Sequence, residues 1–253
     1  MTAATTSSTL AADRSDELTL LGLVGQLELI AFTRLAADSA LAPSLDQRLR
    51  LARFSAGAVT RLERIFDRIR ELGGSPQEEV ARFATVMDDF DERTPSSSWW
   101  ERLLKAYVGY GVADDFCKEA AVGLDAATNT LVMEVLDGTS HAELVVSELA
   151  AAGADDAVLS SRLALWGRRM VGEALGVVQS LVQSQPALAR LVVDAAVVQS
   201  AQVPGADGVV ATGTVSADGI ASFDNAQAEA ASRLFGRLTA EHTHRMERLG
   251  LTA

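Results

Sequence analysis

The segment 44–73 constrains the fold more than any other part of the chain, because its apolar residues follow a helical period without interruption. They recur at three- and four-residue steps, the spacing of one buried helix face: Leu51, Phe54, Ala58, Ile65 and Leu72. Arg61 falls on the same face, between Ala58 and Ile65. A charge in this position requires a carboxylate partner or a polar cavity, since burying it unpaired is costly.

Further helices are expected along the rest of the chain, and almost nothing is strand-like. Alanine is abundant and aromatic residues make up only 5% of the 253 residues, which favours closely packed helices over a sheet. Ser44 should cap the helix at 44–73, and Gly73 should end it. The expected long helices are 16–39, 44–73, 99–122, 126–152, 154–185 and one from Asp224 or Asn225 to Leu249, with a brief apolar helix at 187–200 and a weaker piece at 76–91.

Long helices joined by short turns predict an all-α protein, an antiparallel four-helix bundle with additional C-terminal helices. We expect residues 16–253 to form a single domain. The Thr/Ser/Ala-rich residues 1–15 are expected to be a disordered leader, and the Gly-rich residues 201–223 a flexible loop.

Charge and cysteine content limit the possible surroundings of the protein. The net charge of −12 disfavours a general nucleic-acid or anionic-membrane surface. Cys117 is the only cysteine, so no internal disulfide is possible. The N-terminal residues do not resemble a signal peptide, and no charge-free run reaches the length of a membrane span. We therefore expect a soluble, cytoplasmic protein with no membrane association.

Several other polar residues share predicted helix faces with apolar residues. Glu28, Asp115, His141 and Glu173 each lie on such a face. Carboxylate and imidazole groups that project inward from several helices build metal sites in helical bundles. The simpler interpretation is an ionic network in which Arg61 neutralises Glu28 or Asp115, without a metal.

Three long motifs resemble one known family. They read LAPSLDQRLRLARFSAGAVTRLERI (41–65), WWERLLKAYVGYGVADDFCKEAA (99–121) and RLALWGRRMVGEAL (162–175). Together they resemble the bacterial ferritin-like proteins related to tRNA hydroxylases, over most of the chain from Leu20 to Leu181 and the final helix. The resemblance implies a ferritin-like bundle and a di-iron site that hydroxylates the 2-methylthio-isopentenyl-adenosine of tRNA.

The same resemblance implies that the iron ligands are incomplete. In such relatives the second helix should read Ala-Glu-x-x-His-Phe, which places the glutamate on Ala58 and the histidine on Arg61. Glu28 would keep the ligand of the first helix, and His141 the histidine of the fourth. Asp115 is the best match on the third helix, with Asp114 and Glu119 as alternatives.

A count of histidines leads to the same expectation without any alignment. The chain has three, His141, His242 and His244, and its only Glu-x-x-His sequence runs from Glu241 to His244 in the last helix. A di-iron centre that needs two such pairs cannot be assembled from these residues in the usual way. A guanidinium, moreover, is always protonated and cannot bind a metal cation.

We therefore predict a degenerate ferritin-like site in which Arg61 forms a salt bridge with Glu28 and Asp115, with no cofactor. The alternative is a mononuclear iron site formed by Glu28, Asp115 and His141. The corresponding functions are a non-catalytic scaffold or binding protein, expected to be a homodimer, and an oxygen-dependent hydroxylase of the tRNA-modification type. The acidic charge disfavours tRNA as a partner, and no catalytic residue is identified.

Overall fold

The structure is a computed structural model that describes residues 2–201 and 218–253. These residues form helices and connecting turns, and none of them lies in a strand, which confirms the all-α prediction. The helices are α1 (Thr2–Leu41), α2 (Leu45–Glu71), α3 (Pro76–Ala81), α4 (Asp88–Arg93), α5 (Trp99–Leu104), η1 (Lys105–Gly109), α6 (Tyr110–Ala121), α7 (Ala126–Val135), α8 (Thr139–Asp155), α9 (Ala157–Ser184), α10 (Pro186–Ala201) and α11 (Asp218–Arg248).

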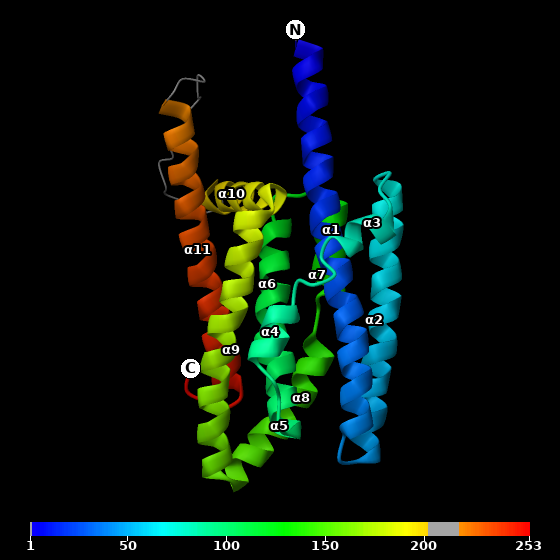
Figure 1. Ribbon diagram of the computed structural model, residues 1–253, viewed down its shortest axis with the longest axis vertical. Coiled ribbons are helices and arrows are strands. Elements are labelled where there is room, and N and C mark those ends of the chain that lie inside the picture. The colour runs from blue at the N-terminus through cyan, green and yellow to red at the C-terminus, as the bar shows by residue number, and fades with distance from the viewer. Residues whose placement is uncertain (1, 202–217) are drawn as a thin grey trace.

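The long helices lie roughly side by side and form a bundle (Figure 1). Helices α1 and α2 form an antiparallel hairpin along one edge, while α9 and α11 lie at the opposite edge with α6 between them. Helix α10 crosses one end of the bundle, because the chain bends by 104° between α9 and α10 at Gln185 and Pro186. Pro186 opens α10, where its missing N–H is tolerated and its fixed φ suits a helix start.

Local sequence signals set the ends of several helices. Ser44 caps α2 in a complete capping box with Gln47, and Gly73 follows the helix with a φ of 79°, as predicted for both positions. Asp125 and Asp156 cap α7 and α9 by accepting hydrogen bonds from the first backbone N–H groups of each helix.

A π-helical segment, η1, lies within the continuous helix formed by α5 and α6. It ends at Gly109. A Cβ atom at Gly109 would lie 2.5 Å from Cζ of Phe90, so only glycine allows the Phe90 ring to pack this closely. The Phe90 ring also makes an edge-to-face contact with Tyr110.

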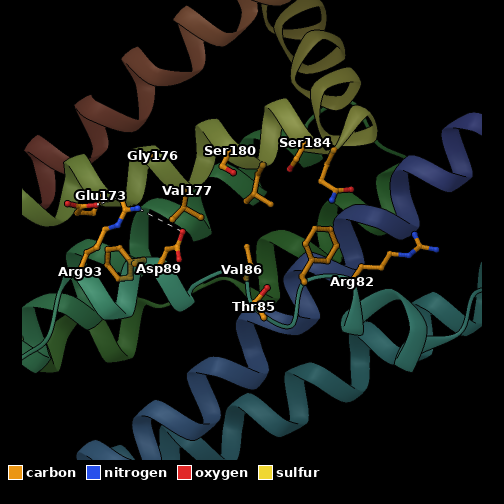
Figure 2. Close-up of a pocket in the computed structure, with 14 residues that line it drawn as sticks. Arg82, Thr85, Val86, Asp89, Arg93, Glu173, Gly176, Val177, Ser180 and Ser184 are labelled. Carbon is orange, nitrogen blue, oxygen red and sulfur yellow. Dashed lines mark hydrogen bonds and ion pairs between the residues drawn. The ribbon is translucent and has the colours of Figure 1, made fainter.

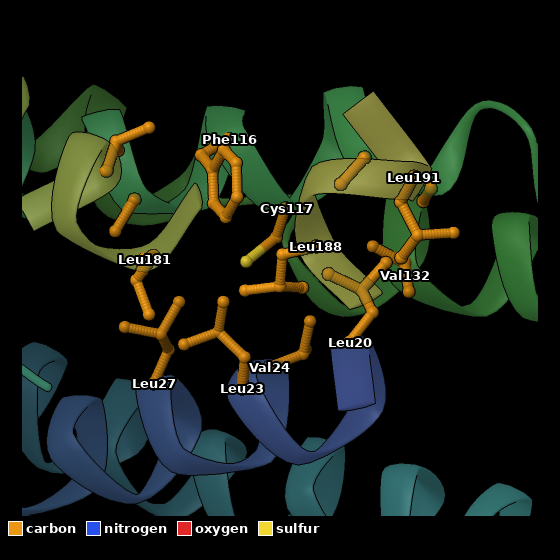
Figure 3. Packing of buried hydrophobic residues seen from close by; sticks show 14 of the residues in the cluster. Leu20, Leu23, Val24, Leu27, Phe116, Cys117, Val132, Leu181, Leu188 and Leu191 are labelled. Atoms are coloured by element: carbon orange, nitrogen blue, oxygen red, sulfur yellow. The ribbon is translucent and has the colours of Figure 1, made fainter. Parts of the chain in front are cut away.

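The main core joins α1 to the helices at the other side of the bundle. Leu20, Leu23, Val24 and Leu27 project from α1 towards Phe116 and Cys117 of α6 and towards leucines of α9 and α10 (Figure 3). The four α1 side chains are each at most 5% exposed, and Phe116 and Cys117 are fully buried. This apolar packing fixes the position of α1, which also carries Glu28 and Arg34.

The structure differs from the sequence prediction at three places. Residues 2–15, expected to be a disordered leader, belong to α1, and α11 begins at Asp218 rather than at Asp224 or Asn225. The single helix expected at 126–152 is divided at Leu136–Gly138 into α7 and α8. Most of the predicted loop at 201–223 lies outside the described residues; Ala201 closes α10 and residues 218–223 are helical.

One helix in the described part of the chain, from Arg14 to Leu41, is long and apolar enough to cross a membrane by length and composition. Its most apolar window is 56% buried within the protein, as is typical of a core helix. The bent pair formed by α9 and α10 passes the same test only if both helices count as one span.

Candidate functional site

Arg61 and Glu28 form an ion pair between α2 and α1. Nε of Arg61 donates to both Oε1 and Oε2 of Glu28 at 3.1 Å, and Nη2 lies 2.9 Å from Oε2. The Glu28 side chain is only 5% exposed and that of Arg61 30% exposed. Arg61, which lies on the otherwise apolar face of α2, therefore has a carboxylate partner in the structure, as predicted. Both carboxylate oxygens of Glu28 accept hydrogen bonds from its guanidinium.

The ion pair lines a cavity of about 270 Å³ between α1, α2, α6 and the α7–α8 turn. Its wall combines apolar residues with charged and polar groups from all four of these elements. It is lined by Leu27, Glu28, Ala31, Arg34, Leu35, Phe54, Arg61, Ala106, Tyr110, Asp114, Val135, Leu136, Asp137, Gly138 and His141. The cavity thus brings together three of the residues singled out in the sequence, Glu28, Arg61 and His141.

Arg34 is a second guanidinium at this cavity, and the sequence prediction did not include it. Its Cζ lies 4.5 Å from the centre of the Tyr110 ring, a stacking contact that holds the side chain in place. Its Nε and Nη1 atoms are buried and have no hydrogen-bond partner among the described residues. Tyr110 itself donates its hydroxyl to Asp91, at 2.8 Å from Oδ1.

His141 also lines the cavity, near the start of α8. Its ring meets Phe54 edge to face, with 5.6 Å between the ring centres, and its buried Nε2 has no partner in the described part of the chain. Burial lowers the pKa of His141 to about 3, and the positive charges of Arg34 and Arg61 act in the same direction. The imidazole is therefore neutral at physiological pH.

The carboxyl groups of the cavity hold protons more tightly than usual. Burial raises the pKa of Glu28 to about 7, although Arg61 and Arg34 oppose the shift. Burial also raises the pKa of Asp114 to about 6, with the neighbouring Asp115 acting in the same direction. The removal of these carboxylates from water thus outweighs the attraction of the nearby guanidinium groups.

Asp115 does not join the Arg61–Glu28 pair, which corrects the predicted three-residue salt bridge. It pairs instead with Arg245 of α11, whose Nη2 lies 2.6 Å from Oδ2 of Asp115. These two residues line a second cavity, of about 240 Å³, which shares Asp114 and His141 with the first. Asp114 therefore lines both cavities, whereas Asp115 lines only the second and does not reach the cavity that contains Glu28.

A larger cavity than these two lies elsewhere among the described residues. It is an open groove of about 480 Å³ between α9 and the segment from Arg82 to Arg93, with Arg93 and Glu173 at one end and Arg82 at the other (Figure 2). Glu173, which the sequence placed on a buried face, is partly exposed here and lies 3.5 Å from Nη1 of Arg93. Arg93 pairs with Asp89 and Glu173 of the groove, and Arg82 pairs with Glu79 outside it, so the groove offers weaker evidence of a ligand than the Arg61 cavity.

A family model described as the ferritin-like domain of actinomycetes matches residues 13–195. The chain belongs to this ferritin-like family. The match covers α1 from residue 13, all of α2 to α9 and most of α10, and therefore includes all the residues that line the cavity of Glu28 and Arg61. No curated protein matches the chain. The expected ferritin-like bundle is thus confirmed, at the level of the family.

The ferritin-like fold implies a di-iron site, and the residues of this cavity do not fit one. Such a site takes one Glu from each of two helices and a Glu-x-x-His pair from each of two others. Here the second helix carries Ala58 and Arg61 at the two positions where the resemblance implies a glutamate and a histidine. Both oxygens of Glu28 accept hydrogen bonds from Arg61. Within residues 2–201 and 218–253, no group of three or more His, Cys, Asp or Glu side chains is arranged to hold a metal ion.

Arg34, Tyr110 and Arg245 are the residues of the two cavities that sequence reasoning missed. Arg34 follows Ala31 by three residues on the α1 face that also carries Leu35, so the same argument that identified Arg61 could have found it. The pairing of Asp115 with Arg245 joins residues far apart in the sequence, and no local pattern indicates it.

Proposed function

We propose that this ferritin-like protein is a non-catalytic binding protein in which the ion pair of Arg61 and Glu28 replaces the metal centre. The observation that supports this most directly is the engagement of both Glu28 oxygens by Arg61. A permanently charged guanidinium in this position supplies the positive charge that iron supplies in a di-iron relative. It also repels a divalent cation that approaches Glu28.

The cavity remains after the loss of the metal ligands, and we propose that it binds a small ligand. Its volume of about 270 Å³ is near the lower limit of typical small-molecule sites. Nε and Nη1 of Arg34 are donors without acceptors among the described residues, and leaving such groups buried and unpaired costs about 1–3 kcal/mol each. A ligand with a hydrogen-bond acceptor that reaches Arg34 would recover part of this free energy.

Calorimetric titration with Mn²⁺, which is stable to air and accepts the same ligands as Fe²⁺, tests the metal-free part of the proposal. The expected result is no binding in the micromolar range, because the Arg61 guanidinium holds Glu28. Micromolar binding that disappears in Glu28→Gln would contradict the proposal. Binding that persists in Glu28→Gln would place the metal elsewhere on the protein and leave this cavity metal-free.

The alternative function is an oxygen-dependent hydroxylase of the tRNA-modification type, suggested by the resemblance of the three sequence motifs. It requires an iron site that Glu28, Asp115 and His141 would form, yet Asp115 pairs with Arg245 outside the cavity of the other two. The net charge of −12 also disfavours contact with tRNA phosphates. A filter-binding assay with tRNA at increasing salt separates the two functions: we expect no specific retention.

The proposed binding protein is soluble and cytoplasmic, without a membrane partner. The single cysteine, Cys117, is buried and free, as suits a reducing compartment. The apolar window of α1 lies largely within the core, so its hydropathy is explained by packing against α6 and α10. When cells of the native host are fractionated, we expect to recover the protein in the soluble fraction.

A further inference from the structure

A pocket of about 360 Å³ lies next to the cavity of Glu28, between α1, α4, α5 and the start of α6. Five charged residues from these elements and η1 line it: Arg34, Asp38, Asp91, Arg102 and Lys105. We term it the Arg102 pocket, because Arg102 lines this space and not the cavity of Glu28. Arg34 and Tyr110 line both spaces, so their stacked side chains lie between them.

Both carboxylates of the Arg102 pocket are engaged by its own side chains. Nη1 of Arg102 donates to Oδ1 of Asp38 at 3.1 Å, and the Asp38 side chain is only 4% exposed. Nζ of Lys105 lies 2.7 Å from Oδ1 of Asp91, which also accepts a hydrogen bond from the Tyr110 hydroxyl. Each carboxylate thus neutralises one cation of the pocket.

Arg34 is the third cation of the pocket, and it lacks an acidic partner. No carboxylate oxygen in the described part of the chain lies within 4.0 Å of its guanidinium nitrogens. Asp38 follows Arg34 by four residues, the spacing at which oppositely charged side chains pair on a helix, but Arg102 holds it. Because Nε and Nη1 of Arg34 are enclosed, Nη2 is the nitrogen that a bound group can reach.

The acids on the other side of Arg34 do not neutralise it either. Both oxygens of Glu28 accept hydrogen bonds from Arg61. Asp114 lines the cavity of Glu28 but not the Arg102 pocket. Burial raises the pKa of Asp114, and among the positive charges that oppose this shift Lys118 acts most strongly and Arg34 least. The charge of Arg34 is therefore in excess on the side of the pocket.

The Arg102 pocket consequently carries one positive charge more than its carboxylates balance, in a chain whose net charge is −12. Solvent reaches its rim, since the side chains of Arg102 and Asp91 are 36% and 46% exposed. Arg102 uses one N–H group on Asp38 and retains further N–H groups for a second acceptor. These properties suit an anion that enters from solvent.

We propose that the Arg102 pocket binds a small carboxylate ligand, whose single negative charge neutralises Arg34. Guanidinium groups form strong, charge-assisted hydrogen bonds with carboxylates. A phosphate group, with a charge of about −1.5 to −2, would leave excess negative charge beside Asp38 and Asp91. The pocket volume equals that of about a dozen water molecules at ~30 Å³ each, so there is room for a substituent on the carboxylate.

The Arg102 pocket and the cavity of Glu28 are different spaces, so this proposal stands whether or not the cavity is occupied. Saturation-transfer NMR at pH 7 and low salt tests it, with benzoate as the probe and benzamide as its neutral counterpart. The parent should transfer saturation to benzoate and not to benzamide, and Arg34→Met should weaken benzoate binding at least about tenfold. Equal transfer to both probes, or none to benzoate, would overturn the proposal.

Two variants with opposite expected effects locate the ligand in the Arg102 pocket. Asp38→Asn removes a negative charge at nearly constant size and should strengthen benzoate binding at least about threefold. Arg102→Met removes a positive charge and frees Asp38 to pair with Arg34, so it should weaken binding. An increase in affinity cannot result from partial unfolding, which keeps the test valid if Arg34→Met folds poorly.

Arg64→Met is the matched control, because it removes the same charge from α2, outside the Arg102 pocket. Its affinity for benzoate should equal that of the parent. If Arg64→Met weakened binding as much as Arg102→Met, benzoate would respond only to the overall charge of the protein and the proposal would fail. An unchanged or lower affinity in Asp38→Asn would likewise refute the assignment of this pocket.

Discussion

Arg61 and Glu28 approach each other across the hairpin of α1 and α2, with Nε of Arg61 3.1 Å from each oxygen of Glu28. Under the proposed function, this contact stands in place of a di-iron centre. It is held in place by the helices on both sides, since Ala58 and Ile65 of the same α2 face are fully buried. The ion pair is thus part of the bundle interior.

Removal of Arg61 is expected to destabilise the fold, and more at high pH than at low pH. In Arg61→Ala, Glu28 loses its partner and must take up a proton in the protein interior even at pH 8, a loss of roughly 1–3 kcal/mol in the free energy of unfolding together with the lost hydrogen bonds. At pH 5 Glu28 takes up a proton and much of this loss disappears, because a neutral carboxyl needs no counter-charge. Urea unfolding at the two pH values measures the difference.

Arg64→Ala is the matched control for this experiment. Arg64 belongs to the same helix and pairs with Glu134, but both side chains are substantially exposed. Solvent-exposed pairs contribute about 0–1 kcal/mol, so this variant should unfold nearly like the parent at either pH. If Arg61→Ala behaved like Arg64→Ala, the structural importance of the buried pair would be disproved.

The protonation of Glu28 predicts how stability depends on pH. The folded protein holds the pKa of Glu28 at about 7, above the unfolded value of 4.5, so folding binds protons between these limits. Glu28 therefore contributes a loss of stability as the pH rises from 4.5 to 7, amounting to about 3 kcal/mol at most. Glu28→Gln, which cannot ionise, should show a flatter dependence between pH 5 and pH 8.

Other titratable groups around Glu28 determine the pH dependence of the free energy of unfolding that remains in Glu28→Gln. Asp114, with a pKa of about 6, changes stability in the same direction, and His141, with a pKa of about 3, in the opposite one. Arg34 and Arg61 stay charged throughout this range. If the free energies of unfolding of Glu28→Gln and of the parent changed with pH in parallel, Glu28 would not titrate as described.

Gly111 is expected to be required for the pairing of Asp115 with Arg245. A Cβ at this position would lie 2.9 Å from Cζ and Nε of Arg245, so Gly111→Ala must displace the guanidinium from a largely buried ion pair. We expect a loss of about 1–3 kcal/mol in unfolding free energy, despite the better helix propensity of alanine. Thermal and urea unfolding measure it.

Gly172→Ala provides the comparison for Gly111→Ala. Gly172 lies within α9, and nothing is found within 4 Å of an added Cβ, so alanine should stabilise the protein by about 0.5–1 kcal/mol. The two glycine variants are therefore predicted to shift stability in opposite directions. A gain of stability in Gly111→Ala would mean that Arg245 does not need the space that glycine provides.

Sequence periodicity was sufficient to predict the helices and the central ion pair. The stripe on 44–73 identified Arg61 as buried and in need of an acid, and Glu28 was one of the two partners considered. The Ser44 cap and the Gly73 stop were also predicted, because both follow from backbone hydrogen bonding and φ preferences within a few residues. The cap and the stop depend on interactions within a few residues, so they can be predicted from the local sequence alone.

The features that were missed depend on contacts between distant segments. Asp115 lies on a buried face as predicted, but its choice of Arg245 over Arg61 depends on how α11 packs against α6. The break between α7 and α8 falls at Leu136–Gly138, where no proline marks a stop. The stacking of Arg34 on Tyr110 likewise joins two helices whose relative rotation no single-helix pattern determines.

Metal content is the most direct test of the central claim, that Arg61 and Glu28 replace the di-iron centre. The protein should be produced in cells supplied with iron and manganese, purified without chelators, and measured by mass spectrometry of its metals. The account predicts well under one iron or manganese ion per chain, in both the parent and Glu28→Gln. One or two ions per chain in the parent, lost in Glu28→Gln, would contradict it.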